Sequence, residues 1–114
     1  MTSIVLITGA TGGIGRALSR QLHAQGLRVA AVGRDANRLA DVEAHARIVA
    51  DTTSPEGAAQ AVSGCQDLMG ACPALLAHCV GSTLITPLHR TQAQAYREVM
   101  RVNLDSAFFM LQAW

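Results

Sequence analysis

Residues 8–15 read Thr8-Gly9-Ala10-Thr11-Gly12-Gly13-Ile14-Gly15, and this glycine-rich stretch decides the fold. An apolar run at 3–8, without polar alternation, comes before it and has the pattern of a strand buried on both faces. From Ile14 onward, apolar residues recur at the period of a helix with one buried face. A strand, a glycine turn and an amphipathic helix in this order predict the first β-α unit of a parallel α/β sheet.

The same alternation continues to the end of the sequence. Further strands are predicted at 28–32, 47–50 and 75–80. Gly26 ends the first helix, Asp35 caps a short helix toward His45, Ser54 and Pro55 begin a helix to about Ser63, and Thr91 caps a last helix reaching Trp114. The order β-α-β-α-β-α-β-α predicts an α/β fold with a Rossmann-type doubly wound parallel sheet, here half a domain within one unit, 1–114.

Composition narrows the class of partners and the compartment. Half of the 114 residues are apolar, the net charge is +1, and no lysine occurs, so we expect neither nucleic acid nor membrane as a partner. No signal peptide or membrane span is recognisable, which predicts a cytoplasmic protein. Cys65, Cys72 and Cys79 recur every seven residues, a spacing that favours free thiols over a metal site.

Each glycine of the turn has a physical reason to be there. Gly9 permits a sharp exit from the strand, Gly12 or Gly13 lets a phosphate approach the backbone, and Gly15 lets the helix pack closely. The helix N-terminus, with Thr11 and Ile14 beside these glycines, offers free N–H groups to a pyrophosphate. The turn therefore predicts a dinucleotide site.

The turn resembles the cofactor motif T-G-x-x-x-G-x-G of short-chain dehydrogenases/reductases. It also fits T-G-x-x-G-x-x-G, the turn of the extended branch of that family. The resemblance implies hydride transfer between a nicotinamide cofactor and a small-molecule carbonyl or alcohol substrate, with a Tyr as acid/base and a Lys that lowers its pKa.

Arg34 predicts which cofactor is bound. An NAD site places Asp or Glu at about the end of the second strand, but Gly33 stands there and Arg34 follows. A guanidinium can pair with a 2′-phosphate, so the sequence predicts NADP(H), with NAD less favoured. The alternative is a solvated Arg34 beside Asp35.

Two later segments also resemble the cofactor site of the family. Asp51 and Thr52 end the third strand, where a family Asp meets the adenine amino group, although an Asx turn or a helix cap is an alternative for Asp51. The segment 78–81 resembles Asn-Asn-Ala-Gly but retains only Gly81. Cys79 is placed beside the cofactor ribose, and a Cys79–His78 nucleophile pair is disfavoured because adjacent strand residues point to opposite faces.

Asn103 is the predicted catalytic residue. It resembles the helix Asn of the family, whose distortion of the backbone frees a carbonyl to hold a water in the proton relay; an Asn on a polar stripe is the alternative. Arg34 and Asn103 together favour the main branch. The predicted cofactor-binding residues are Gly9, Thr11, Gly12, Gly13, Ile14, Gly15, Arg34, Asp51, Thr52, Cys79 and Gly81.

The sequence lacks the acid/base pair of the family. There is no Lys, and the single Tyr, Tyr96, is followed by Arg97-Glu98-Val99-Met100. We therefore expect a chain truncated before the Tyr-x-x-x-Lys segment and inactive alone; the alternative is a non-catalytic NADP(H)-binding module that assembles with another chain. A bare fourth strand and an apolar last helix predict a homo-oligomer.

Overall fold

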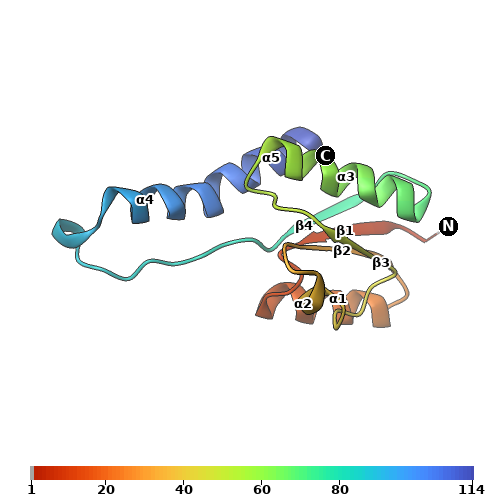
Figure 1. Ribbon diagram of the computed structural model, residues 1–114. Coiled ribbons are helices and arrows are strands. Elements are labelled where there is room, and N and C mark those ends of the chain that lie inside the picture. The colour runs from red at the N-terminus through yellow and green to blue at the C-terminus, as the bar shows by residue number, and fades with distance from the viewer. Residues whose placement is uncertain (1) are drawn as a thin grey trace.

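The computed structural model describes residues 2–114, which form a four-stranded parallel sheet with helices on both faces (Figure 1). The strands are β1 (Ile4–Thr8), β2 (Arg28–Gly33), β3 (Ala46–Val49) and β4 (Leu75–His78), in the order β3-β2-β1-β4. Helices α1 (Gly13–Ala24), α2 (Ala36–Leu39) and α3 (Pro55–Met69) connect them. The doubly wound Rossmann-type fold predicted from the sequence is confirmed.

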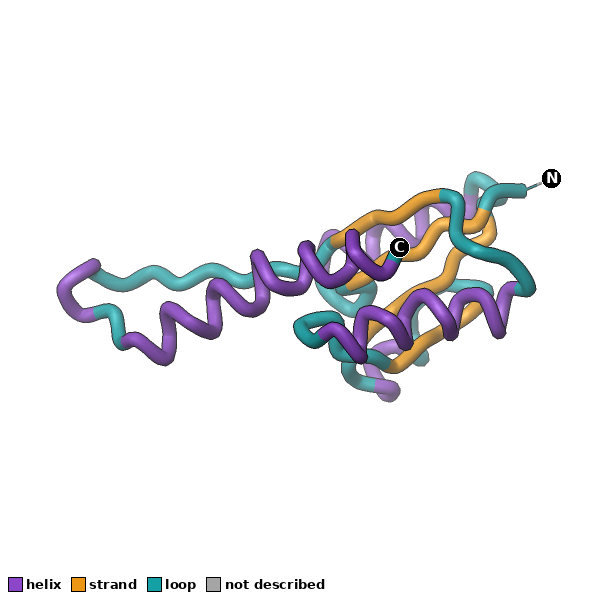
Figure 2. Tube along the Cα trace, turned by 90° about the horizontal axis from the view of Figure 1, so that it is seen from above, coloured by secondary structure: helices purple, strands orange, loops and turns teal. Residues whose placement is uncertain are grey.

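After β4 the chain leaves the sheet and returns to it. It passes through a short 3₁₀ turn η1 (Leu88–Arg90), helix α4 (Ala93–Met100), a π-helical turn η2 (Arg101–Asp105) and helix α5 (Ser106–Ala113). The extended residues 79–92 and α4 form an arm that projects beyond the sheet, as both views show (Figures 1 and 2). Ile85 and Leu88 on this arm are 97% and 92% exposed.

Two apolar cores lie on opposite faces of the sheet, because successive strand residues point to opposite sides. On one face, Leu6 and Val32 pack with α3 and with Met110 of α5. On the other face, Val5 and Ile7 pack with Leu39 of α2 and with α1. All five residues of β1 are buried, as the unbroken apolar run predicted.

Two helices differ from the prediction. Asp35 caps α2 as predicted and accepts hydrogen bonds from the N–H groups of Asn37 and Arg38, but the helix ends at Leu39 and does not reach His45. The reason is Arg47, whose guanidinium takes the carbonyls of Leu39 and Val42 that a longer helix would use. Conversely, α3 continues past Ser63 to Met69, because Cys65 and Met69 are buried in the core.

The predicted cap of the last helix is wrong. Thr91 does not cap it: its hydroxyl donates to the carbonyl of Pro87, and Gln92 stands at the N-cap without a side-chain hydrogen bond. The continuous helix predicted to Trp114 is interrupted by η2. The fourth strand is also shorter than predicted: it ends at His78, two residues before Val80.

Within residues 2–114, no helix has the length and apolar character that a membrane crossing requires.

A histidine pair lies at the end of the sheet far from the glycine turn. The rings of His23 and His45 are 4.7 Å apart between centroids. Nδ1 of His45 accepts a hydrogen bond from the backbone N–H of Val29 at 3.0 Å, and the backbone N–H of His45 donates to the carbonyl of Val29 at 2.8 Å. Desolvation lowers the pKa of His45, and the nearby His23 and Arg28 lower it further. The fold therefore favours the neutral ring.

We expect the stability of the fold to decrease as the pH falls below about 6.5, the usual pKa of histidine. Because folding lowers the pKa of His45, the unfolded chain binds more protons, and this contribution is complete above that pH and lost below it. His45→Asn keeps an acceptor near Nδ1 but cannot titrate. The midpoint of urea unfolding should therefore vary less with pH in His45→Asn than in the wild type, and equal pH slopes would contradict the assignment.

Candidate functional site

The glycine turn is closed by contacts between backbone atoms. Gly9 has φ +64°, a left-handed conformation that side chains disfavour. A Cβ on Gly9 would overlap the carbonyl of Cys79, and a Cβ on Gly15 would overlap the carbonyl of Gly9. The turn thus brings β1, α1 and the end of β4 to direct backbone contact, in line with the roles predicted for these two glycines.

A cleft of about 240 Å³, here called the main cleft, opens at the carboxyl ends of the strands. This is where ligands bind in open α/β sheets. Its walls come from the glycine turn, the ends of β2 and β3 and the segment after β4; they are Gly9, Thr11, Gly12, Val32, Gly33, Arg34, Arg38, Ala50, Thr52, Cys79, Val80 and Gly81.

Seven of the eleven predicted cofactor-binding residues line the main cleft: Gly9, Thr11, Gly12, Arg34, Thr52, Cys79 and Gly81. Of the two glycines left open as the phosphate contact, Gly12 lines this cleft and Gly13 does not. Gly13 borders a separate hollow with Arg16 and Arg20. Ile14 is 78% exposed and borders, with Asn103, an open depression that shares residues 79–81 with the main cleft.

Two arginines give the rim of the main cleft a positive charge. Arg34 is exposed, and within residues 2–114 it forms no ion pair, so its guanidinium is not held by Asp35. Arg38 follows one helical turn later and donates to the carbonyl of Thr11 at 3.1 Å. Both arginines also line a second hollow of about 350 Å³ with Thr11 and Asp35. Arg38 was not among the residues predicted from the sequence, although it follows Arg34 by four residues and lies in the helix that Asp35 caps.

Asp51 forms the Asx turn that the sequence left as an alternative. Its Oδ1 accepts from the backbone N–H of Thr53 at 3.0 Å and from the Thr53 hydroxyl at 2.6 Å. It is not the helix cap, because Ser54 caps α3 by accepting from the N–H of Gly57. The Thr53 hydroxyl bond is the main cause that lowers the pKa of Asp51. Asp51 is exposed and ionised, whereas its neighbour Thr52 is buried on the cleft wall.

His78 and Cys79 point to opposite faces of the sheet, as expected for adjacent strand residues. Cys79 packs against the apolar core on the α1 face, and burial raises the pKa of its thiol. His78 lies on the α5 face between two hydroxyls: its Nδ1 is 2.7 Å from Thr8 Oγ1 and its Nε2 is 3.0 Å from Ser106 Oγ. The two side chains therefore form no nucleophile pair.

The tautomer of His78 follows from its partners. The hydroxyl of Ser106 donates to the carbonyl of Val102 at 2.5 Å, so its oxygen must accept the proton of His78 Nε2. Nδ1 then accepts the proton of Thr8. Burial lowers the pKa of His78, which keeps the ring neutral. This chain of bonds joins the end of β1 to the π-helical turn.

Asn103 lies in the middle of the π-helical turn, and its side chain ties the helix to the segment after β4. Its Nδ2 donates to the carbonyl of Val99 at 2.8 Å and to that of Ser82 at 2.9 Å, and its Oδ1 accepts from the N–H of Ser82 at 3.1 Å. The bond to Val99 engages the carbonyl one helical turn back, which is a known cause of helix distortion. The helix is thus irregular at the position where the family resemblance implied it.

The comparisons with known proteins agree with this geometry. The sequence model of the short chain dehydrogenase family matches residues 3–114. The chain belongs to the short-chain dehydrogenase/reductase family. It is 30% identical, over 96% of its length, to cis-2,3-dihydrobiphenyl-2,3-diol dehydrogenase of Paraburkholderia xenovorans.

Solved structures of this family share the fold. A short chain dehydrogenase from Mycobacterium smegmatis superposes with a TM-score of 0.92 at 23% identity, over 98% of this chain and 50% of that one. A blue fluorescent protein from a metagenomic library, solved in complex with NADPH, superposes with a TM-score of 0.83 at 28% identity, over 97% and 49%. The chain covers 43% of the Paraburkholderia enzyme, so it spans about half the length of the proteins that it resembles.

We expect Gly15→Ala to destabilise the protein strongly and Gly13→Ala to leave it stable. A methyl group on Gly15 would overlap the backbone of Gly9, whereas one on Gly13 meets nothing within 4 Å. Overpacking against a backbone that cannot move costs about 1–3 kcal/mol or more. The free energy of unfolding in urea should therefore fall by at least about 2 kcal/mol in Gly15→Ala only. Equal stability of the two variants would show that the turn is not closed as described.

Proposed function

We propose that this chain is the NADP(H)-binding portion of a short-chain dehydrogenase/reductase that transfers hydride between NADP(H) and a small-molecule carbonyl or alcohol. The observation that carries the cofactor assignment is the free guanidinium of Arg34 on the rim of the main cleft. A guanidinium without an internal partner can form charge-assisted hydrogen bonds to a phosphate. A neighbouring Arg38 adds to the positive potential there.

The packing around Gly33 supports NADP(H) over NAD(H). An NAD-type site would carry an acidic side chain at about this position. A Cβ on Gly33 would lie 2.9 Å from Cγ2 of Thr11 and 3.3 Å from Cδ1 of Leu39. The position therefore has no room for a carboxylate unless Thr11 shifts, and Arg34 is the next polar side chain along the rim of the main cleft.

The pyrophosphate is assigned to the N-terminus of α1. Gly12 is the N-cap residue of that helix, and it lines the main cleft. Within residues 2–114 no acidic side chain lies in that first turn, so nothing opposes an anion there. Among relatives, the metagenomic protein named above was solved with NADPH, and it is 28% identical to this chain.

The residues of this chain bind and orient, and the nicotinamide cofactor supplies the hydride chemistry when it is bound. Asp51 is assigned to the adenine amino group, Thr52, Cys79 and Gly81 to the walls beside the adenosine, and Asn103 to a proton relay through its effect on the helix backbone. A nicotinamide placed past Gly81 would approach the depression lined by Ile14 and Asn103. Cytoplasmic location stays a prediction.

A homo-oligomer is part of this proposal. Leu104, Phe108 and Leu111 are spaced along one side of the last helix and are 56%, 59% and 66% exposed. β4 is an edge of the sheet, and its Leu75 is 49% exposed. Large exposed apolar surfaces of this kind mark association.

We expect NADPH to bind more tightly than NADH, by about tenfold to 150-fold, as one charge-assisted contact of about 1.5–3 kcal/mol provides. Arg34→Ala should remove most of that preference and leave the affinity for NADH nearly unchanged. Arg20→Ala, an exposed arginine of α1 outside the main cleft, is the matched control. Titration calorimetry measures both ligands. If Arg34→Ala weakens NADH as much as NADPH, Arg34 is structural and the assignment to NADP(H) fails.

We expect the 114-residue chain alone to show no NADPH-dependent reduction of a carbonyl substrate. It has no Tyr-x-x-x-Lys, and both ring nitrogens of His78 are engaged by hydroxyls. Absorbance of NADPH at its reduced-nicotinamide band, followed with a panel of ketones and aldehydes, measures this. A robust turnover would contradict the expectation and would make His78 and Tyr96 the first residues to replace. If the chain binds NADPH without turnover, a reading frame with Ser and Tyr-x-x-x-Lys after Trp114 favours the enzyme over the non-catalytic module.

A further inference from the structure

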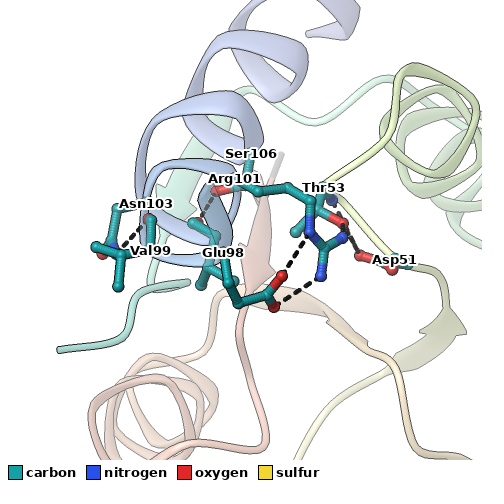
Figure 3. Close-up of polar contacts among 8 residues, drawn as sticks. Asp51, Thr53, Glu98, Val99, Arg101, Asn103 and Ser106 are labelled. Atoms are coloured by element: carbon teal, nitrogen blue, oxygen red, sulfur yellow. Dashed lines mark hydrogen bonds and ion pairs between the residues drawn. The ribbon is translucent and has the colours of Figure 1, made fainter. Parts of the chain in front are cut away.

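Arg101 joins the end of β3 to the helix that carries Asn103 (Figure 3). Its Nη1 donates to the hydroxyl of Thr53 at 2.5 Å, across 48 residues of sequence. Its Nε and Nη2 donate to the two carboxylate oxygens of Glu98 at 3.0 and 2.8 Å, a bidentate pair one turn back on the helix. The guanidinium plane is fixed by Glu98, so the remaining nitrogen is directed at Thr53.

The hydroxyl of Thr53, which accepts from Arg101, in turn donates a hydrogen bond to Asp51. A hydroxyl has one proton, and that of Thr53 goes to Oδ1 of Asp51 at 2.6 Å, so its oxygen lone pair is what Arg101 engages. Thr53 is only 8% exposed, and hydrogen bonds shielded from water reinforce one another along a chain. The order Glu98, Arg101, Thr53, Asp51 is therefore a continuous network that ends on one carboxylate oxygen.

The other oxygen of Asp51 accepts no hydrogen bond from residues 2–114. Within residues 2–114, the hydrogen bonds to this carboxylate all reach Oδ1, from the N–H and the hydroxyl of Thr53. Asp51 is exposed, and it lies near enough to Arg34 and Arg101 that both lower its pKa, after the larger effect of Thr53. Oδ2 is thus an ionised acceptor whose orientation is set by the two bonds that Thr53 makes to Oδ1.

We propose that Arg101 is a positioning residue for cofactor recognition: through Thr53 it fixes Asp51 so that Oδ2 accepts a hydrogen bond from the adenine amino group. This inference rests on the proposed function, in which Asp51 meets adenine. The network also ties the adenine contact to the π-helical turn of Asn103, because Arg101 is the first residue of that turn. Binding at the adenine end and the placement of Asn103 then depend on one side chain.

A purely structural role would have a different signature. Exposed ion pairs within one helix contribute little stability, and the Arg101–Glu98 pair is of that kind, with side chains 39% and 55% exposed. Arg101 differs from such a pair because it also contacts Thr53, which holds the Asp51 carboxylate that the cofactor would touch. The test must therefore measure recognition of the adenine amino group and not stability.

The probe is a pair of cofactors that differ only at that group: NADPH, and its deamino analogue in which hypoxanthine replaces adenine. Wild type should bind NADPH about tenfold or more tightly than the analogue, as expected for one hydrogen bond to a charged acceptor. Arg101→Met should reduce this ratio to about threefold or less, because the Thr53 hydroxyl is then no longer held by Arg101 and orients Asp51 less tightly. Arg97→Met, an exposed neighbour outside the network, should keep the wild-type ratio.

Thr53 supplies a second pair of variants that does not depend on Arg101→Met folding. Thr53→Val removes the hydroxyl with little change in volume and should lower the ratio as Arg101→Met does. Thr53→Ser keeps the hydroxyl and should keep the wild-type ratio of affinities. Thermal unfolding of each variant separates a loss of fold from a loss of recognition.

The outcomes are distinguishable. If wild type binds neither NADPH nor NADH, the proposed function fails and this inference with it. If wild type binds NADPH but does not discriminate against the deamino analogue, Asp51 does not read the amino group and the inference alone is overturned. It is also overturned if wild type discriminates and Arg101→Met or Thr53→Val keeps the full ratio in a folded protein.

Discussion

The site depends on one set of contacts in which no side chain takes part: Gly15 packs on the carbonyl of Gly9, and Gly9 packs on the carbonyl of Cys79. These contacts hold the N-terminus of α1, the end of β1 and the end of β4 at backbone distance. A single Cβ at either glycine would separate them, and the main cleft, which lies between the same segments, would change its width. The width of the cleft therefore depends on the absence of a Cβ atom at Gly9 and at Gly15.

The sequence predicted those parts of the structure that depend on local pattern. The buried strands followed from unbroken apolar runs, the caps at Asp35 and Ser54 from side chains that accept backbone N–H groups, and the turn from glycine. The errors came from side chains that hydrogen-bond backbone carbonyls a few residues back along the chain. Arg47 ends α2 by taking carbonyls that a longer helix would need, and Thr91 serves the turn at Pro87 instead of the next helix. These contacts span four to eight residues, and the helix-start and helix-stop patterns used for the prediction do not include them.

The residues of the candidate site also differ in whether a local sequence pattern predicts them. The seven predicted residues that line the main cleft were found from short local patterns, and Arg38, four residues after Arg34, was visible in the same way. Arg101 could not be found from sequence at all, since its partner Thr53 lies 48 residues away and neither residue belongs to a motif. Two polar chains, Thr8–His78–Ser106 and Asp51–Thr53–Arg101, run from strand ends to the same π-helical turn. The turn thus receives contacts from His78, at the end of β4, and from Thr53, which follows β3.

The π-helical turn also determines which side chains of α5 are buried against the sheet. A π turn holds one residue more than an α-helical turn, so every later residue is rotated by about 100° relative to an unbroken α-helix. Ser106 and Met110 are buried as a result, and Asp105 is exposed. In an unbroken helix the slot of Ser106 would fall to Asp105, which would put a carboxylate against His78, and that of Met110 would fall to Phe109. The extra residue thus rotates α5 so that Ser106 and Met110 face the sheet and Asp105 faces away from it. An alignment of this helix with a straight one requires a one-residue gap here.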